Sequence, residues 1–100
     1  MTLSEIQSYF EAVMKERGFN EQTAKDKLLL LVEEVGELAK AIRKHENIGI
    51  DYTRIENYDS IESEVADVFI VLISLCNVLN IDLFEALDEK EKINSKRVWK

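Results

Sequence analysis

Hydrophobic residues recur with the period of an α-helix in four stretches of this chain, and polar breaks separate the stretches. The pattern predicts helices near residues 3–17, 21–45, 60–80 and 83–97, with one long irregular connection at residues 46–59. Proline is absent and glycine occurs only three times, so the usual punctuation of β-rich folds is missing. The expected fold class is therefore all-α, a four-helix bundle-like arrangement in one domain spanning residues 1–100.

Helix-capping signals support these boundaries. The segments "TLSE", "DSIE" and "DLFE" each place a capping residue three positions before a glutamate, which predicts Thr2, Asp59 and Asp82 as N-caps. Asn20 is the predicted N-cap of the second helix, and Gly18 is predicted to end the first.

The second and third predicted helices each carry two acids, three residues apart, inside an apolar stripe. At about 100° per residue, Glu37 lies about 60° from Glu34 on the second helix, and Asp67 lies about 60° from Glu64 on the third. The apolar residues around these acids are Leu30, Leu31, Leu38 and Ala41 on the second helix, and Ile61, Val68, Val71, Leu75 and Val78 on the third. Residues three apart on a helix are neighbours, so two such helices packed antiparallel would bring four carboxylates together.

Four carboxylates in a partly dry cleft repel one another unless their pKa values rise or a cation binds between them. All-oxygen ligation suits Mg²⁺ or Mn²⁺ better than zinc. Glu34, Glu37, Glu64 and Asp67 are therefore candidate metal ligands. Two other interpretations stay open, namely acids that face solvent and acids that pair with Lys or Arg of a partner. A di-iron site is disfavoured because it requires Glu-x-x-His motifs, and His45 lies outside any such motif and is predicted to be a surface residue.

Composition excludes several classes of function. A formal charge of -7 and a pI near 4.7 argue against binding nucleic acid through a basic surface. The single cysteine, Cys76, excludes an internal disulfide and is predicted to be a small core residue in a reducing compartment. The segment "MTLSEIQSYF" lacks a signal-peptide pattern, and the apolar run "VFIVLISLCNVL" is short for a membrane span. We therefore expect a cytoplasmic protein without a nucleic-acid or membrane partner.

Two acidic motifs resemble those of a known family. The segment "EEVGEL" at residues 33–38, followed by "EVADVFIVL" at residues 64–72, resembles the EExxE and ExxD signature of the MazG-like, all-α nucleoside triphosphate pyrophosphohydrolases. Near the C-terminus, "KEKINSKRVW" is similar to the basic pattern of that family, with Lys90, Asn94 and Arg97 at corresponding positions. Upstream, "ERGFNEQTAKDKLLLLVEE" resembles the segment that approaches the nucleotide base, where Phe19 and Lys27 match. The resemblance covers nearly the whole chain.

The resemblance implies the all-α NTP pyrophosphatase fold and a hydrolase that cleaves a nucleoside triphosphate between its α and β phosphates. The products are NMP or dNMP and pyrophosphate, and the cofactor is Mg²⁺ or, alternatively, Mn²⁺. By the same resemblance Glu34, Glu37, Glu64 and Asp67 hold the metal, and Glu33 or Glu34 orients or deprotonates the attacking water.

The resemblance also assigns residues to the phosphates and the base. The implied phosphate-binding residues are Lys90, Asn94, Lys96 and Arg97, and the implied base-binding residues are Phe19 and Lys27. Basic residues in the last turn of a helix also complement its dipole, which is a structural alternative for the phosphate-binding group. The base preference stays open, because Thr23 stands where relatives that act on dCTP often carry a histidine, and other relatives hydrolyse dUTP or phosphoribosyl-ATP.

The implied biological role is nucleotide-pool house-cleaning. A homodimer or homotetramer is expected, because a helix that is apolar on every side needs neighbours on every side. The alternative function, of a different class, is a non-catalytic helical module that dimerises or binds a regulatory partner through the acids.

Overall fold

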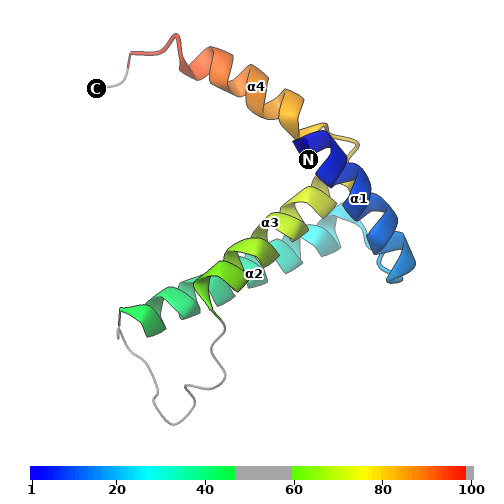
Figure 1. Ribbon diagram of the computed structural model, residues 1–100, viewed down its shortest axis with the longest axis vertical. Helices are drawn as coiled ribbons and strands as arrows, with labels where there is room; N and C mark the ends of the chain where they lie inside the picture. Colours follow the sequence, from blue (N-terminus) through cyan, green and yellow to red (C-terminus); the bar gives the residue numbers. More distant parts are fainter. Residues whose placement is uncertain (47–59, 99–100) are drawn as a thin grey trace. The chain divides into compact units, whose positions relative to one another are not determined.

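The computed structural model describes residues 1–46 and 60–98, and this part of the chain folds into four α-helices without a strand. Figure 1 shows the helices α1 (Leu3–Glu16), α2 (Ala24–His45), α3 (Ile61–Val78) and α4 (Leu83–Asn94). The prediction of an all-α fold with four helices is confirmed. Residues 47–59 of the predicted long connection lie outside the described residues.

The first and fourth helices begin at the predicted caps. The hydroxyl of Thr2 accepts a hydrogen bond from the Glu5 amide, and the Glu5 carboxylate accepts one from the Thr2 amide, both at 3.1 Å. The Asp82 carboxylate accepts a hydrogen bond from the Glu85 amide at 2.9 Å. Each cap satisfies a backbone N–H that the helix itself leaves without an acceptor.

The N-cap of the second helix is Thr23, so the prediction of Asn20 as its cap was wrong. The Thr23 hydroxyl accepts from the Asp26 amide at 3.2 Å, and the Asp26 carboxylate accepts from the Thr23 amide at 2.9 Å. Thr23 has an acid three residues later that completes this reciprocal pair, whereas Asn20 is followed at that distance by Thr23 itself. For α3, the Ser60 hydroxyl accepts from the Ser63 amide at 3.1 Å. The predicted cap Asp59 lies outside the described residues.

The first helix ends at a glycine, as predicted. Gly18 has a φ of +83°, and its amide donates to the Lys15 carbonyl at 3.1 Å. The Phe19 amide donates to the Met14 carbonyl at 2.8 Å, which completes a Schellman motif. A residue without a Cβ is favoured in this left-handed conformation.

The third helix ends in the same way, with asparagine in place of glycine. Asn80 has a φ of 56°, and its amide donates to the Asn77 carbonyl at 3.2 Å. The Ile81 amide donates to the Cys76 carbonyl at 2.9 Å. Asparagine is one of the few residues with a side chain that tolerate this conformation, so the chain turns toward α4 without glycine.

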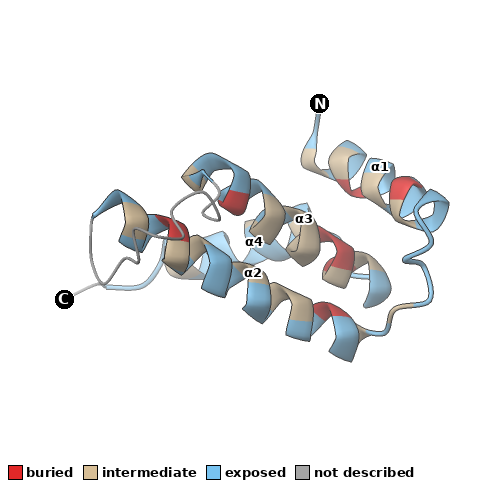
Figure 2. Ribbon diagram, turned by 90° about the horizontal axis from the view of Figure 1, so that it is seen from below, coloured by how far each residue is buried: buried red, intermediate tan, exposed pale blue. Residues whose placement is uncertain are grey.

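The described residues divide into two compact units. The terminal unit comprises Met1–Glu21 and Ile73–Lys100, and the hairpin unit comprises Gln22–Leu72. In the hairpin unit, α2 and the first part of α3 run side by side in opposite directions (Figures 1 and 2). The terminal unit contains α1, the last part of α3 and α4, and α1 contacts α4. The organisation of residues 1–100 as one domain stays a prediction.

Few side chains are fully buried, and Figure 2 places them on α1, α2 and α3. In the terminal unit the buried apolar residues are Val13, Ile73 and Cys76. The prediction of Cys76 as a small core residue is confirmed, and burial raises the pKa of its thiol above the ordinary value.

A polar side chain, Gln7, joins α1 to the corner between α3 and α4. Its amide nitrogen donates to the Asn77 side chain at 3.0 Å and to the Ile81 carbonyl at 2.9 Å. Its amide oxygen accepts from the Leu83 backbone amide at 2.8 Å, and the Asn77 side chain donates back to the Gln7 carbonyl at 3.1 Å. Gln7 is only 8% exposed, so this network satisfies groups that would be costly to bury without partners.

Within the described residues, no single helix is long and apolar enough to cross a membrane. Only α3 and α4 together have the length and apolar composition of a membrane span, and this pair bends by 98° between the two helices.

Candidate metal centre

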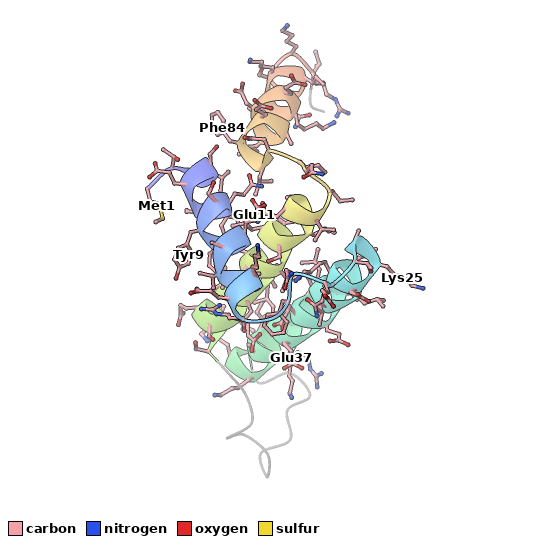
Figure 3. The ribbon with its side chains drawn as sticks, turned by 90° about the vertical axis from the view of Figure 1, so that its right-hand side faces the viewer. Met1, Tyr9, Glu11, Lys25, Glu37 and Phe84 are labelled. Atoms are coloured by element: carbon pink, nitrogen blue, oxygen red, sulfur yellow. The ribbon has the colours of Figure 1, made fainter. Side chains whose placement is uncertain are left out.

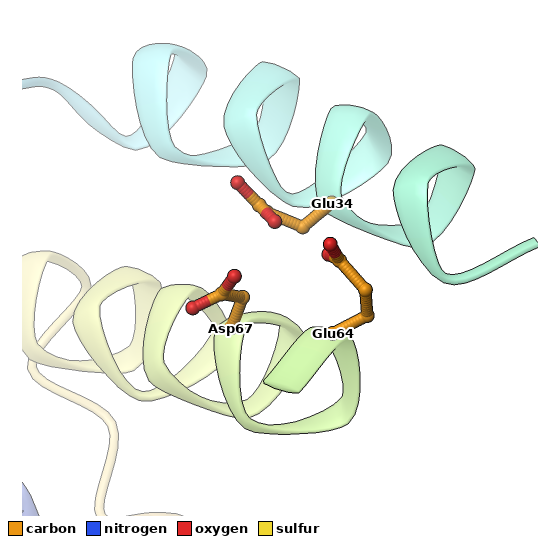
Figure 4. Close-up of side chains that lie close together, drawn as sticks. All are labelled: Glu34, Glu64 and Asp67. Carbon is orange, nitrogen blue, oxygen red and sulfur yellow. The ribbon is translucent and has the colours of Figure 1, made fainter. Parts of the chain in front are cut away.

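Three carboxylates meet between α2 and α3 in the hairpin unit. Glu34 projects from α2, and Glu64 and Asp67 project from α3 (Figure 4). One oxygen from each of the three side chains lies within 4.8 Å of the other two. Glu64 is only 2% exposed, whereas Glu34 is half-buried. The sequence thus places a buried acid at the centre of an acidic cluster.

Local structure explains why these side chains meet. Glu64 lies in the first turn of α3, just after the cap at Ser60, and Asp67 follows one turn later on the same side of the helix. Glu34 lies in the middle of α2, which runs antiparallel to α3 and faces it (Figure 4). Two α3 side chains and one α2 side chain therefore converge.

The electrostatics of the cluster favour a bound cation. Two unit charges about 5 Å apart repel by roughly 3 kcal/mol at an effective dielectric constant of about 20. Water screens such repulsion poorly when one of the carboxylates, Glu64, is buried. A divalent cation between the three oxygens would replace repulsion by attraction.

The donor set fits a hard cation. Around a magnesium ion with octahedral geometry and ligand distances of about 2.1 Å, ligand oxygens lie roughly 3.0 to 4.2 Å apart. The three carboxylate oxygens lie within 4.8 Å of one another, so small side-chain rotations would bring them to these separations. The cluster contains no cysteine or histidine, the ligands that zinc usually recruits.

Glu37, the fourth predicted ligand, is exposed on α2 and lies outside the cluster (labelled in Figure 3). Three residues advance a helix by about 4.5 Å. Because α2 and α3 are antiparallel, this step carries Glu37 in one direction from Glu34 and carries Asp67 in the opposite direction from Glu64. The structure therefore brings together three of the four predicted ligands. Glu33, the other candidate for positioning water, is also exposed.

The predicted phosphate-binding residues lie in the terminal unit. Lys90 and Asn94 belong to α4, and Lys96 and Arg97 follow it. Asn94 is half-buried, and the three basic side chains are exposed. Their role toward phosphates stays a prediction.

The two predicted base-binding residues belong to different units. Phe19 follows α1 in the terminal unit and is 44% exposed, whereas Lys27 belongs to α2 in the hairpin unit and is buried. Seven residues separate Lys27 from Glu34, so both side chains lie on the same face of α2. The Lys27 ammonium donates to the Gln22 side-chain oxygen at 2.7 Å, and burial lowers the Lys27 pKa below its ordinary value.

Sequence reasoning missed Gln22 as a partner of Lys27. The sequence did contain a signal for this pair. Lys27 lies in the apolar stripe of α2, a buried ammonium requires hydrogen-bond acceptors, and the Gln22 side chain just before the helix offers one. The prediction of His45 as a surface residue is confirmed, since its side chain is 68% exposed.

Comparisons with known proteins identify a family and a similar solved structure. The family model described as the MazG nucleotide pyrophosphohydrolase domain matches residues 22–98. A solved structure described as iMazG from Vibrio DAT 722 is similar with a TM-score of 0.69 and 25% sequence identity, over 100% of this chain and 100% of that one. Among curated proteins, no match was found. The matched region contains α2, α3 and α4, and with them all three clustered carboxylates.

Proposed function

Because this chain belongs to the MazG nucleotide pyrophosphohydrolase domain family, we propose that it cleaves a nucleoside triphosphate between the α and β phosphates. Members of the family are hydrolases that act on phosphorus anhydrides, and the enzyme class follows from membership. The proposed products are NMP or dNMP and pyrophosphate, and the proposed cofactor is Mg²⁺, with Mn²⁺ as the alternative. The observation that carries the proposal is the convergence of Glu34, Glu64 and Asp67 within 4.8 Å.

The charge of the substrate explains why this proposal includes a cation. A triphosphate carries several negative charges, and carboxylates alone would repel it. A bound divalent cation would supply attraction to the phosphate oxygens and neutralise charge that develops during the reaction.

The protein's own carboxylates then have separate tasks. Glu64 and Asp67 hold the cation from α3, and Glu34 holds it from α2. Glu37, which is exposed on α2, is proposed as the fourth ligand. A carboxylate at Glu33 or Glu34 orients or deprotonates the attacking water.

Other residues are proposed to select and orient the nucleotide. The proposed phosphate-binding group comprises Lys90, Asn94, Lys96 and Arg97. Phe19 and Lys27 are proposed to contact the base, and the buried position of Lys27 on the Glu34 face of α2 supports this assignment. The proposal also includes a house-cleaning role in the cytoplasm and a homodimeric or homotetrameric assembly.

The test is a product analysis with the purified full chain. Canonical and modified nucleoside triphosphates are incubated with Mg²⁺, with Mn²⁺ and with excess EDTA, and the products are separated by chromatography. We expect monophosphate and pyrophosphate only when a divalent cation is present. The substrate that gives the highest kcat/KM identifies the base and sugar preference.

Two other outcomes would overturn the proposal. Diphosphate and orthophosphate as products would mean that the β–γ bond is cleaved. Inactivity across the panel, with helical circular dichroism and cooperative unfolding retained, would favour the non-catalytic binding module.

A further inference from the structure

A glutamine side chain at the beginning of α2 is held in one orientation by a buried lysine. Gln22 lies directly before the N-cap Thr23 and is half-buried. Its amide oxygen accepts a hydrogen bond from the Lys27 ammonium at 2.7 Å. Lys27 is only 5% exposed, so this acceptor offsets part of the cost of removing the ammonium from water. Both residues belong to the hairpin unit, as does Glu34.

This hydrogen bond decides which end of the Gln22 amide is directed at Lys27. A glutamine amide has an acceptor oxygen and a donor NH2 group, and a half-turn of the amide exchanges their positions. An ammonium has only donors, so the exchanged orientation would set the NH2 group against a buried positive charge. The oxygen therefore faces Lys27, and the NH2 group is what Gln22 has to offer a ligand. In this state Gln22 acts as a hydrogen-bond donor.

The position of the pair along α2 suits the base of a nucleotide that binds at the carboxylates. Lys27 and Glu34 are seven residues apart on the same face of α2, which places them about 10 Å apart along the helix axis. A single nucleotide spans such a separation from its phosphates to its base. With the phosphates at a cation held by Glu34, the base would lie near the beginning of α2, where Gln22 and Lys27 are.

A fixed donor at that place distinguishes two classes of base. Uracil, guanine and hypoxanthine carry a carbonyl oxygen, an acceptor, at the ring position where cytosine and adenine carry an amino group, a donor. The Gln22 NH2 group would donate to the carbonyl oxygen of the first class. Against the second class, two donors would meet and both would lose hydrogen bonds to water.

We propose that Gln22 is a specificity-determining residue that selects nucleotides with a carbonyl-bearing base over those with an amino-bearing base. Lys27 is the positioning residue that keeps the Gln22 amide in its donor orientation. The proposal rests on the proposed function and deepens it, since it names the class of substrate.

The first experiment compares substrates that differ at this ring position. The purified full chain with Mg²⁺ is given UTP or CTP, ITP or ATP, and the corresponding deoxynucleotides, and pyrophosphate release is measured. We expect kcat/KM to be at least about 10-fold higher for UTP than for CTP, and for ITP than for ATP. Equal values or the reverse preference would overturn the role of Gln22 and leave the proposed hydrolysis intact. No pyrophosphate from any of these substrates would contradict the proposed function, and this proposal with it.

The second experiment exchanges the donor for an acceptor. Gln22→Glu keeps the size of the side chain and an oxygen for Lys27, but its second oxygen only accepts. The preference should therefore reverse toward CTP and ATP, whose amino groups donate. The matched control is Lys25→Gln, which makes the same change of one negative unit at an exposed residue of α2 (Lys25 is labelled in Figure 3) and should keep the natural preference. An unchanged preference in Gln22→Glu, or an equal change in Lys25→Gln, would contradict the assignment.

The third experiment measures binding without turnover and does not depend on whether Gln22→Glu folds. UMP and CMP are titrated by calorimetry, with Mg²⁺, into the natural protein and into Gln22→Met, which lacks both hydrogen-bonding groups. The natural protein should bind UMP at least about 10-fold more tightly than CMP. Gln22→Met, with its helical circular dichroism retained, should bind the two with dissociation constants that differ by less than about threefold. A preference for UMP that is equal in both proteins would show that another group reads the base.

Discussion

Two buried polar side chains, one from each unit of this protein, have opposite surroundings. In the terminal unit, Gln7 is 8% exposed and its amide bonds to Asn77, Ile81 and Leu83. In the hairpin unit, Glu64 is 2% exposed, and one of its carboxylate oxygens lies within 4.8 Å of oxygens of Glu34 and Asp67. The first arrangement stabilises the fold, because donors meet acceptors. The second gathers like charges, and such a cluster is characteristic of a binding site rather than of a stable core.

The comparison predicts its largest effect for Glu64→Gln in the hairpin unit. If Glu64 holds the cation, kcat/KM should fall by about 1,000-fold, which corresponds to about 4 kcal/mol of transition-state stabilisation. The unfolding temperature without metal should stay equal or rise, because one negative charge leaves the cluster. Steady-state kinetics with Mg²⁺ and thermal unfolding with EDTA measure the two quantities.

The matched control is Glu62→Gln, which changes an exposed acid two residues away on α3. Its kcat/KM should stay within about twofold of the natural value. The kcat/KM of Glu37→Gln should lie between those of Glu62→Gln and Glu64→Gln, since Glu37 is exposed and lies outside the cluster. Comparable losses for Glu62→Gln and Glu64→Gln would mean that the cluster is not the site.

For Gln7→Ala in the terminal unit, a smaller effect is expected, and it concerns the free energy of unfolding instead of activity. It removes partners from the Leu83 amide, the Ile81 carbonyl and the Asn77 side chain, and should cost about 2 to 3 kcal/mol of unfolding free energy. Urea unfolding followed by circular dichroism measures this cost. Ser8→Ala, an exposed neighbour on α1, should change the free energy by less than about 0.5 kcal/mol. A Gln7→Ala protein as stable as the Ser8→Ala protein would contradict the assigned role of the network.

The two left-handed helix ends allow a finer test within the terminal unit. Gly18→Ala should cost about 1 kcal/mol, because φ is +83° and a Cβ is disfavoured there. Asn80→Gly should stabilise by a few tenths of a kcal/mol, because glycine adopts the φ of 56° more readily than asparagine does. Urea midpoints of the two variants should therefore shift in opposite directions. Shifts in the same direction would show that contacts other than backbone strain decide these positions.

The smallest expected effect is a change in how stability depends on pH. It arises from two equivalent capping boxes, one in each unit. Hydrogen bonds from Thr2 lower the pKa of Glu5 below 4.5, and those from Thr23 lower the pKa of Asp26 below 3.8. A carboxylate with a lower pKa in the folded state stabilises the fold at neutral pH, and this contribution is lost as the pH falls through the lowered value.

Urea unfolding between pH 6 and pH 3 checks this expectation. Stability should decrease toward acid, and Glu5→Gln and Asp26→Asn should each make the decrease less steep. Both carboxyl groups are exposed, so the change is small compared with that for Gln7→Ala. An unchanged slope in both variants would mean that the caps do not contribute to acid sensitivity.

Local sequence signals were sufficient for much of the fold. Periodicity located all four helices, and the caps at Thr2 and Asp82 and the end at Gly18 depend on residues within one turn of each other. The error at Asn20 has a local cause as well, because two capping candidates lie three residues apart and only Thr23 has an acid at the reciprocal position. Where capping candidates compete, the reciprocal partner decides.

The site could be predicted only up to the packing of two helices. Helical spacing placed Glu34, Glu37, Glu64 and Asp67 in apolar stripes, and antiparallel packing was expected. The lengthwise alignment of α2 against α3, which decides how far Glu37 lies from Asp67, has no signal in that spacing. Gln7 gave no signal at all, since its partners are 70 or more residues away and no local pattern links them. Residue pairs that depend on tertiary packing are the part that sequence periodicity cannot supply.

The sequence separation of the Gln7 hydrogen bonds also bears on the order in which the chain folds. Gln7 and Leu83 are 76 residues apart, whereas Glu34 and Asp67 are 33 apart. Closing the longer loop costs roughly 0.7 kcal/mol more in chain entropy, which slows closure by about threefold. The helical hairpin is thus favoured to form first, and the capture of α1 by the α3–α4 corner belongs late on the folding pathway. We therefore expect the Gln7 network to slow unfolding and to change the folding rate little, because its hydrogen bonds form after the transition state.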